Sequence, residues 1–126
     1  MAVPEFRLAT AETVLLLGES GSGKSTLLSL ICGTILAQSG NVTVAGTDIA
    51  SLSAGKRDRF RAEQIGLIFH QFNLLPFASV RDNILLPLRF APIRAKRVER
   101  PAQTAERLCH DLGLPANVME VKAGAL

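Results

Sequence analysis

The 126-residue sequence contains only two cysteines and no long apolar run. Cys32 and Cys109 lie far apart, without a C-x-x-C motif or a nearby pair of histidines, so neither a metal site nor a disulfide framework is indicated. We expect both to be buried, reduced thiols. No apolar run approaches the ~20 residues that span a bilayer, and nothing near Met1 resembles a charged leader followed by an apolar stretch.

A strong excess of one charge is also missing, because the formal net charge is +3. The main concentration of basic residues is a single run. A run of this kind is typical of a solvated helical surface, and a nucleic-acid or lipid patch is the alternative. Aromatic residues do not interleave with this run after Phe90, which argues against nucleic acid as a partner. The run consists of Arg89, Arg94, Lys96, Arg97 and Arg100.

What the sequence does contain is an ordinary globular mixture, with 48% apolar and 20% charged residues. Its length predicts one domain with a single core. Continuous apolar runs at residues 13–18 and 65–69 predict buried parallel strands. The alternation within residues 40–46 predicts a half-buried antiparallel strand.

Helices are expected between these strands. One begins after the first strand and stops at Gly33. A polar helix capped by Ser53 spans residues 54–63, and Ser79 with Asp82 marks the start of another that runs through residue 90, despite Pro87. Pro101 opens a last helix, with Leu108 and Leu112 on one face and Gly113 as its stop. Alternating strands and helices predict an α/β fold with a mostly parallel sheet and a small antiparallel part.

The segment "GESGSGKS", residues 18–25, satisfies G-x-x-x-x-G-K-[ST] at every fixed position, between a predicted strand and a predicted helix. Its glycines let successive N–H groups point inward, and the helix N-terminus favours anions. Lys24 is expected to reach the β- and γ-phosphates of a nucleotide, and the Ser25 hydroxyl to coordinate Mg²⁺. The alternative is a Gly/Ser-rich turn that happens to end in Lys-Ser.

The phosphate loop with "SGNVTVAGTDIASLS" and "IGLIFHQFNLLPFASVRDNILLPLRF" resembles the ATP-binding subunits of ABC transporters, especially the lipoprotein-release and macrolide-export type. The resemblance implies a P-loop NTPase fold over residues 1–126, as a partial ATP-binding domain that runs through the Q-loop into the helical region. It implies ATP and Mg²⁺ as cofactors and ATP hydrolysis coupled to transport as the activity. It also implies a second ATP-binding subunit and a transmembrane permease as partners, with the chain peripheral on the cytoplasmic face of the membrane.

The resemblance also implies the residues that contact the nucleotide. Its Q-loop glutamine follows the last aromatic of a strand, where this sequence has His70, with Gln71 one position later. Either His70 replaces that glutamine or it has no ligand role, and Gln71 substitutes only if the segment slips by one residue. The expected cofactor-binding residues are Gly18, Glu19, Ser20, Gly21, Ser22, Gly23, Lys24, Ser25, Thr26, His70 and Gln71.

Several features of the resembled family are missing from these residues. They are the adenine-stacking aromatic, the glycines of the signature motif, the Walker B aspartate with its catalytic glutamate, and the switch histidine. Phe6 is interpreted as a core residue of a strand and His110 as a surface residue. These absences predict an N-terminal half that binds a nucleotide without turning it over.

Two other functional classes remain as alternatives. One is a non-catalytic nucleotide-binding or interaction module, which contacts a membrane partner through the apolar loop "FNLLPFASV". The other is a GTPase or small-molecule kinase, which is disfavoured because the sequence has no guanine-binding "NKxD" motif and no acidic residue evidently placed as a kinase base.

Overall fold

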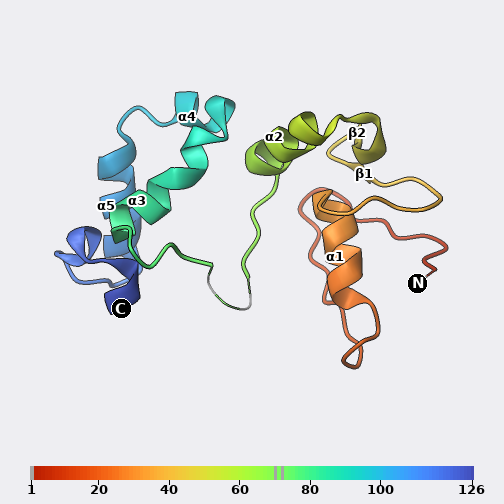
Figure 1. Cartoon of the computed structure of the whole chain (residues 1–126), viewed down its shortest axis with the longest axis horizontal. Helices are drawn as coiled ribbons and strands as arrows, with labels where there is room; N and C mark the ends of the chain where they lie inside the picture. Colours follow the sequence, from red (N-terminus) through yellow and green to blue (C-terminus); the bar gives the residue numbers. More distant parts are fainter. Residues whose placement is uncertain (1, 70, 72) are drawn as a thin grey trace. The chain divides into compact units, whose positions relative to one another are not determined.

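The computed structural model describes residues 2–69, 71 and 73–126, which form two compact units, Met1–Ser53 and Ala54–Leu126 (Figure 1). His70 and Phe72 lie outside the described residues.

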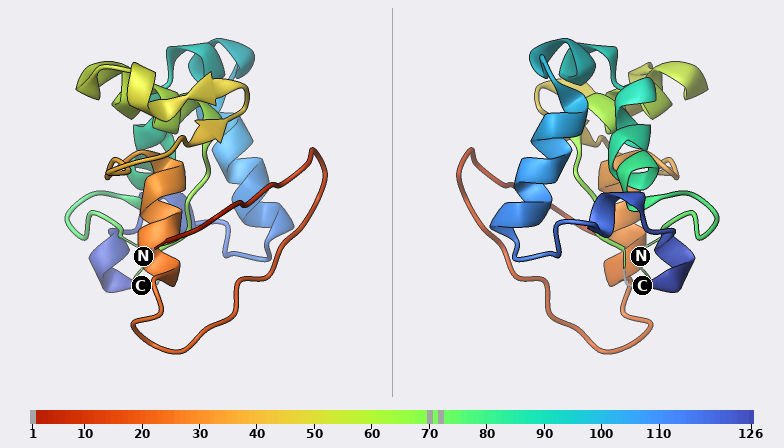
Figure 2. Two further views of the ribbon diagram at one scale, coloured as in Figure 1. Left: turned by 90° about the vertical axis from the view of Figure 1, so that its right-hand side faces the viewer. Right: turned by 90° about the vertical axis from the view of Figure 1, so that its left-hand side faces the viewer.

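The first unit combines one helix with a short hairpin. Helix α1 spans Lys24–Cys32, strand β1 spans Thr43–Val44, strand β2 spans Thr47–Asp48, and a 3-10 turn, η1, follows at Ile49–Ser51. The strands, drawn as arrows in Figure 2, pair antiparallel with Val44 opposite Thr47. Ala45 and Gly46 both have positive φ, of 47° and 78°, as a tight two-residue hairpin requires. The expected small antiparallel part is therefore confirmed.

The second unit is helical among its described residues. Its α-helices are α2 Ala54–Gln64, α3 Val80–Leu85, α4 Pro92–Arg97 and α5 Pro101–Asp111. The 3-10 segment η2, Leu86–Arg89, lies between α3 and α4, and two more, η3 Val118–Glu120 and η4 Ala123–Ala125, follow α5. Helix α4 was not expected as a separate element.

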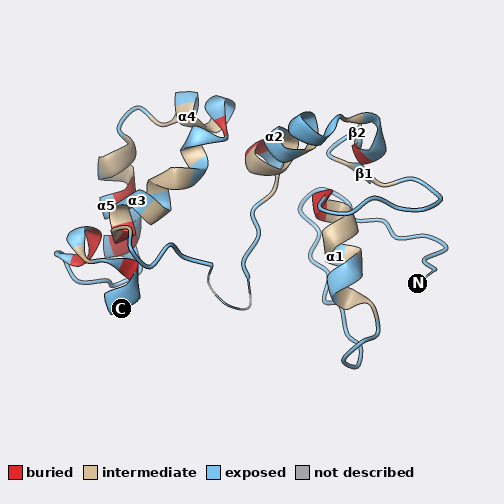
Figure 3. Ribbon diagram, viewed as in Figure 1, coloured by how far each residue is buried: buried red, intermediate tan, exposed pale blue. Residues whose placement is uncertain are grey.

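The core of the second unit lies between α3, α5 and η3, where the buried positions cluster in Figure 3. Cys109 Sγ lies 3.7 Å from Met119 Sδ inside it. Cys32 and Cys109 are both buried thiols, as expected. The core residues are Val80, Ala105, Cys109, Val118 and Met119, with Leu85 packed against them.

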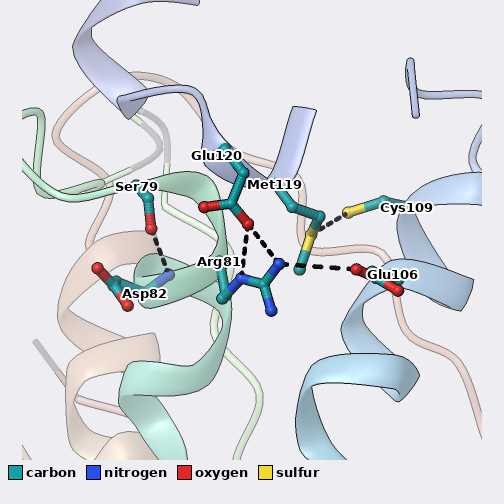
Figure 4. A network of polar contacts seen from close by, with 7 residues as sticks. All are labelled: Ser79, Arg81, Asp82, Glu106, Cys109, Met119 and Glu120. Carbon is teal, nitrogen blue, oxygen red and sulfur yellow. Dashed lines mark hydrogen bonds and ion pairs between the residues drawn. The ribbon is translucent and has the colours of Figure 1, made fainter. Parts of the chain in front are cut away.

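Around this core, Arg81 joins three elements through its guanidinium (Figure 4). Its Nε donates to Glu120 Oε1 at 3.0 Å, and its Nη2 lies 3.6 Å from Glu106 Oε1. Figure 4 also shows the start of α3, where the Ser79 hydroxyl accepts from the Asp82 N–H at 3.0 Å. The expected helix start at Ser79 is confirmed.

The helix ends agree with the sequence in part. Gly33 and Gly113 both have positive φ, of 73° and 79°, and terminate α1 and α5 as expected. Pro87 lies where α3 has already given way to η2, so the predicted helix through residue 90 is α-helical only up to Leu85.

The buried face of α5 is not the face that carries Leu108 and Leu112. Leu108 is 49% exposed and Leu112 is 79% exposed, whereas Ala105 and Cys109 are buried. The buried positions repeat at i and i+4, one position away from those of the two leucines. The small side chains at these two positions allow α5 to approach α3 closely.

The two apolar runs at residues 13–18 and 65–69 have no assigned secondary structure and join no hydrogen-bonded ladder among the described residues. Leu17 is 81% exposed and Ile68 is 92% exposed, so their expected burial is not observed. Phe6, interpreted as a core residue of a strand, is 42% exposed in a segment with no assigned strand. A parallel strand obtains both hydrogen bonds and burial from neighbouring strands, and neither unit supplies a neighbour within its described residues.

Candidate nucleotide-binding site

The predicted phosphate loop is a tight turn that leads directly into α1. Gly21 and Gly23 have φ values of 82° and 98°, a region that favours residues without a Cβ. Between them, the Ser22 N–H donates to Glu19 O at 3.1 Å. The backbone therefore curls around the space in front of the helix, as the sequence predicted.

Gly18 is required by a close contact rather than by its φ angle. A Cβ built on Gly18 would lie 2.5 Å from Ser22 Oγ and 3.6 Å from Lys24 Nζ. A side chain at this position would displace the Ser22 hydroxyl, which is one of the acceptors of Lys24 Nζ. The first glycine of the motif thus preserves the contact between Ser22 and Lys24.

The Lys24 ammonium group is held by the loop itself. Its Nζ donates to Gly18 O, to Glu19 O at 2.7 Å and to Ser22 Oγ at 3.3 Å. These three acceptors account for all three donors of a lysine ammonium. The sequence motif indicated the lysine, but it carries no signal for the two carbonyl groups that fix its position.

The start of α1 presents backbone donors to the same space. Within the described part of the chain, the N–H groups of residues 23–26 have no hydrogen-bond partner. The N-cap, Gly23, has no side chain to satisfy them. Unsatisfied N–H groups and the positive end of the helix dipole together suit a phosphate or another anion.

The Ser25 and Thr26 side chains are exposed in the first turn of α1. A hydroxyl oxygen is the kind of ligand Mg²⁺ accepts, and this ion usually takes few protein ligands because phosphate oxygens and water supply the rest. Among the residues that the structure describes, no group of three or more His, Cys, Asp or Glu could hold a metal ion. Ser25 is thus compatible with a magnesium ion carried by a nucleotide.

Of the predicted Q-loop residues, Gln71 is described and His70 is not. Gln71 is exposed and belongs to the unit Ala54–Leu126, whereas the phosphate loop belongs to the unit Met1–Ser53. His70 lies outside the described residues. His110, interpreted from the sequence as a surface residue, is exposed on α5, with its side chain 90% accessible.

The family model described as "ABC transporter" matches residues 3–124, nearly the whole chain. The chain belongs to the ABC transporter family. The expected resemblance is thereby confirmed.

Relatives of this ABC transporter family member include proteins named as ATP-binding components. The uncharacterized ABC transporter ATP-binding protein Rv0986 of Mycobacterium tuberculosis is 40% identical over 109 residues, which cover 86% of this chain and 43% of the relative. The lipoprotein-releasing system ATP-binding protein LolD of Xanthomonas campestris pv. campestris is 39% identical over 84 residues, 67% of this chain and 35% of the relative. The macrolide export ATP-binding/permease protein MacB of Rhodopirellula baltica is 37% identical over 109 residues, 86% of this chain and 16% of the relative.

A solved structure confirms the fold class. The ATP-binding cassette MJ0796, in a dimeric post-hydrolysis state bound to ADP and Pi, matches with a TM-score of 0.71 and 28% identity, covering 86% of this chain and 47% of that chain. The ABC transporter family member therefore has the P-loop NTPase fold of an ABC ATPase over this span. It spans less than half the length of these relatives. A search of the described helices finds no candidate membrane span.

Proposed function

We propose that this chain is the ATP-binding part of an ABC transporter and that residues 18–26 hold the triphosphate of Mg-ATP. The observation that carries the proposal is the turn before α1. It gathers the Lys24 ammonium group, the N–H groups of residues 23–26 and the positive end of a helix around one space. Backbone and lysine donors arranged in this way are suited to the β- and γ-phosphates.

Each residue of the loop has a distinct part in this proposal. Gly18, Gly21 and Gly23 allow the backbone to turn, and Lys24 donates to the β- and γ-phosphate oxygens. Ser25 supplies a hydroxyl ligand for Mg²⁺, and the bound metal neutralises phosphate charge. Glu19, Ser20, Ser22 and Thr26 contribute backbone donors or hydroxyl groups.

The role of the complete protein is proposed by analogy with the named relatives. We infer ATP hydrolysis coupled to transport, a second ATP-binding subunit as partner, and a permease that keeps the chain on the cytoplasmic face of the membrane. Leu74 and Phe77 are 47% and 72% exposed, which supports an apolar contact of this loop with a permease. His70 and Gln71 are the candidates for the glutamine position of the Q-loop.

Titration calorimetry with Mg-ATP tests the loop assignment. Lys24→Ala should weaken binding roughly 100-fold, because it removes charge-assisted hydrogen bonds to two phosphates. Lys122→Ala is the matched control, since Lys122 is exposed in the other unit. Equal affinity of the Lys24→Ala chain and the unchanged chain would disprove the assignment.

The magnesium role has its own test. Ser25→Ala should weaken binding of Mg-ATP but leave binding of ATP in excess chelator unchanged, because only the metal complex uses the hydroxyl as a ligand. A loss of the same size under both conditions would show that Ser25 acts on the phosphates or on the helix start instead.

A further inference from the structure

The basic residues of this chain are concentrated in one part of the sequence. Residues 54–100 hold ten basic and four acidic residues, a net charge of +6, whereas the remainder holds four basic and seven acidic residues, a net charge of −3. This whole segment lies within the unit Ala54–Leu126. The modest overall charge of +3 therefore conceals a strongly basic region.

The orientation of α4 within this region is fixed by a buried carboxylate. Glu63, at the end of α2, accepts from the N–H groups of Ile93 at 2.7 Å and Arg94 at 3.0 Å. In return, Arg94 Nε donates to Glu63 O at 2.9 Å. Glu63 is the buried polar residue of the described chain, at 9% exposure. These contacts direct one face of α4 towards α2.

The burial pattern of α4 agrees with this orientation. Ala91 is fully buried, and Arg94, Ala95 and Val98 are half-buried. Ile93, Lys96 and Arg97 are exposed, and their i, i+3 and i+4 spacing places them on a common face. The α4 helix thus turns two of its basic residues and its isoleucine to solvent together.

Exposed apolar side chains lie on this face and next to it in the sequence. Ile93, on the face, is 48% exposed, and Phe90, two residues before α4 begins, is 63% exposed. A face made only for solvation does not need two large apolar side chains beside its cations. We call the exposed set of Phe90, Ile93, Lys96 and Arg97 the basic-apolar face.

We propose that the basic-apolar face docks on the surface of a bilayer that contains anionic phospholipids. Lys96 and Arg97 pair with headgroup phosphates, and Phe90 and Ile93 enter the boundary between headgroups and acyl chains. Basic residues with interleaved apolar residues bind membrane interfaces through these two contributions together. Nucleic acid is a poorer match, because stacking of bases needs several aromatic side chains and this face has one.

Co-sedimentation of the full chain with vesicles tests the charged half of the proposal. Binding is expected with vesicles of phosphatidylcholine and phosphatidylglycerol, and not with phosphatidylcholine alone. The variant Lys96→Gln/Arg97→Gln should bind the mixed vesicles roughly 30-fold more weakly, since each cation near an anionic surface contributes about a factor of five.

The control removes the same charge elsewhere. Arg107 and Lys122 are exposed and lie outside residues 54–100, so Arg107→Gln/Lys122→Gln should bind the mixed vesicles like the unchanged chain. Circular dichroism of each variant establishes that the exposed substitutions leave the helices intact. An equal loss of vesicle binding in the control and the test variant would overturn the proposal, because binding would then depend on the net charge of the chain and not on the basic-apolar face.

A substitution of the apolar residue Ile93 distinguishes binding to a bilayer from binding to other polyanions. Ile93→Ser should weaken binding to the mixed vesicles roughly tenfold, because it withdraws an isoleucine side chain from the acyl boundary. The same variant should bind single-stranded DNA or heparin like the unchanged chain, if either is bound at all. The proposal is overturned if the full chain ignores anionic vesicles, binds neutral vesicles equally well, or binds DNA more tightly than the vesicles. Nucleotide is absent from these assays, so their outcome is independent of the proposed ATP site.

Discussion

At the scale of single residues, Asn83 secures the segment that leads into α3. Its Oδ1 accepts from the Leu75 N–H at 2.8 Å, and its Nδ2 donates to Leu75 O and Ser79 O, both at 3.0 Å. One side chain thus replaces the hydrogen bonds that a regular element would give to this loop. The loop also carries the exposed Phe77, so Asn83 positions the apolar surface proposed to contact a permease.

Asn83→Ala should lower the free energy of unfolding by about 1 kcal/mol, because the Leu75 N–H loses its acceptor. Leu75 O and Ser79 O keep the backbone N–H groups of Ala78 and Asn83 as donors. Urea denaturation measures the loss, and hydrogen exchange of the Leu75 amide should accelerate. Asn117→Ala is the matched control, because Asn117 is exposed and its side chain caps nothing. An Asn83→Ala variant as stable as this control would mean that the described bonds are replaced by water without cost.

At the scale of elements, α4 depends on a contact from another helix. It has six residues, far fewer than an isolated helix needs for stability in water. No side chain of its own caps it, and the carboxylate of Glu63 on α2 takes that place. Helix α4 is therefore stable only in contact with α2.

Glu63→Ala should unfold α4 locally and cost about 2 kcal/mol of stability, because the backbone N–H groups of Ile93 and Arg94 lose their carboxylate acceptor. Hydrogen exchange at Ile93 and Arg94 should accelerate before the rest of the unit is affected. Glu99→Ala changes an exposed carboxylate close to the same helix and should have little effect. Unchanged exchange at Ile93 in Glu63→Ala would disprove this dependence.

A second element-scale contact joins the chain before α3 to the chain near Leu126. The Val80 N–H donates to Val121 O at 2.8 Å, and the Gly124 N–H donates to Pro76 O at 3.0 Å. A Cβ on Gly124 would lie 3.0 Å from Pro76 O and 3.1 Å from Pro76 Cβ. The two segments approach this closely because residue 124 has no side chain.

Gly124→Ala should destabilise the unit Ala54–Leu126 by about 1–3 kcal/mol, since backbone must shift to make room. Gly55→Ala is the contrasting variant. Gly55 lies in α2 with no atom within 4 Å of the added Cβ, so this change should stabilise the chain by about 0.5–1 kcal/mol. Thermal unfolding should show a lower midpoint temperature for Gly124→Ala and a higher one for Gly55→Ala. A Gly124→Ala chain that is more stable than the unchanged chain would contradict the close contact with Pro76.

At the scale of the whole molecule, the sequence predicted best what depends on neighbouring residues. The turn of the phosphate loop, the glycine ends of α1 and α5 and the Ser79 helix start all follow from local chemistry, and all are observed. The burial of Ala105 and Cys109 on α5 was not predicted, because it depends on the packing of α5 against α3 and not on side-chain size alone. The bonds of Glu63 and Asn83 connect residues 30 and eight positions apart, and no pattern in the sequence signals them.

The apolar runs at residues 13–18 and 65–69 also depend on residues that are distant in the sequence. Their apolar content predicts buried strands, but burial requires neighbouring strands that the described residues do not supply. The family match and the fold likeness nevertheless agree with the α/β class inferred from the alternation of elements.

Nucleotide binding should therefore be visible as a change in stability of the whole chain. With Mg-ATP at about 100 times its dissociation constant, the free energy of unfolding should rise by about 2.7 kcal/mol, if the unfolded chain has no affinity. Thermal unfolding with and without nucleotide measures the change. Lys24→Ala should lose most of it, and an undiminished shift in that variant would place the binding elsewhere.

The three contacts of the Lys24 ammonium group have a consequence for the kinetics of binding. Lys24 Nζ already donates to Gly18 O, Glu19 O and Ser22 Oγ. These three oxygen atoms therefore compete with a bound phosphate for the ammonium group. When a phosphate binds, the Lys24 ammonium group exchanges the oxygen acceptors of the loop for those of the phosphate. It does not have to be removed from a full shell of water. The association step should then depend weakly on the hydration of Lys24, and dissociation should be assisted by carbonyl groups that recapture the lysine as the phosphate leaves.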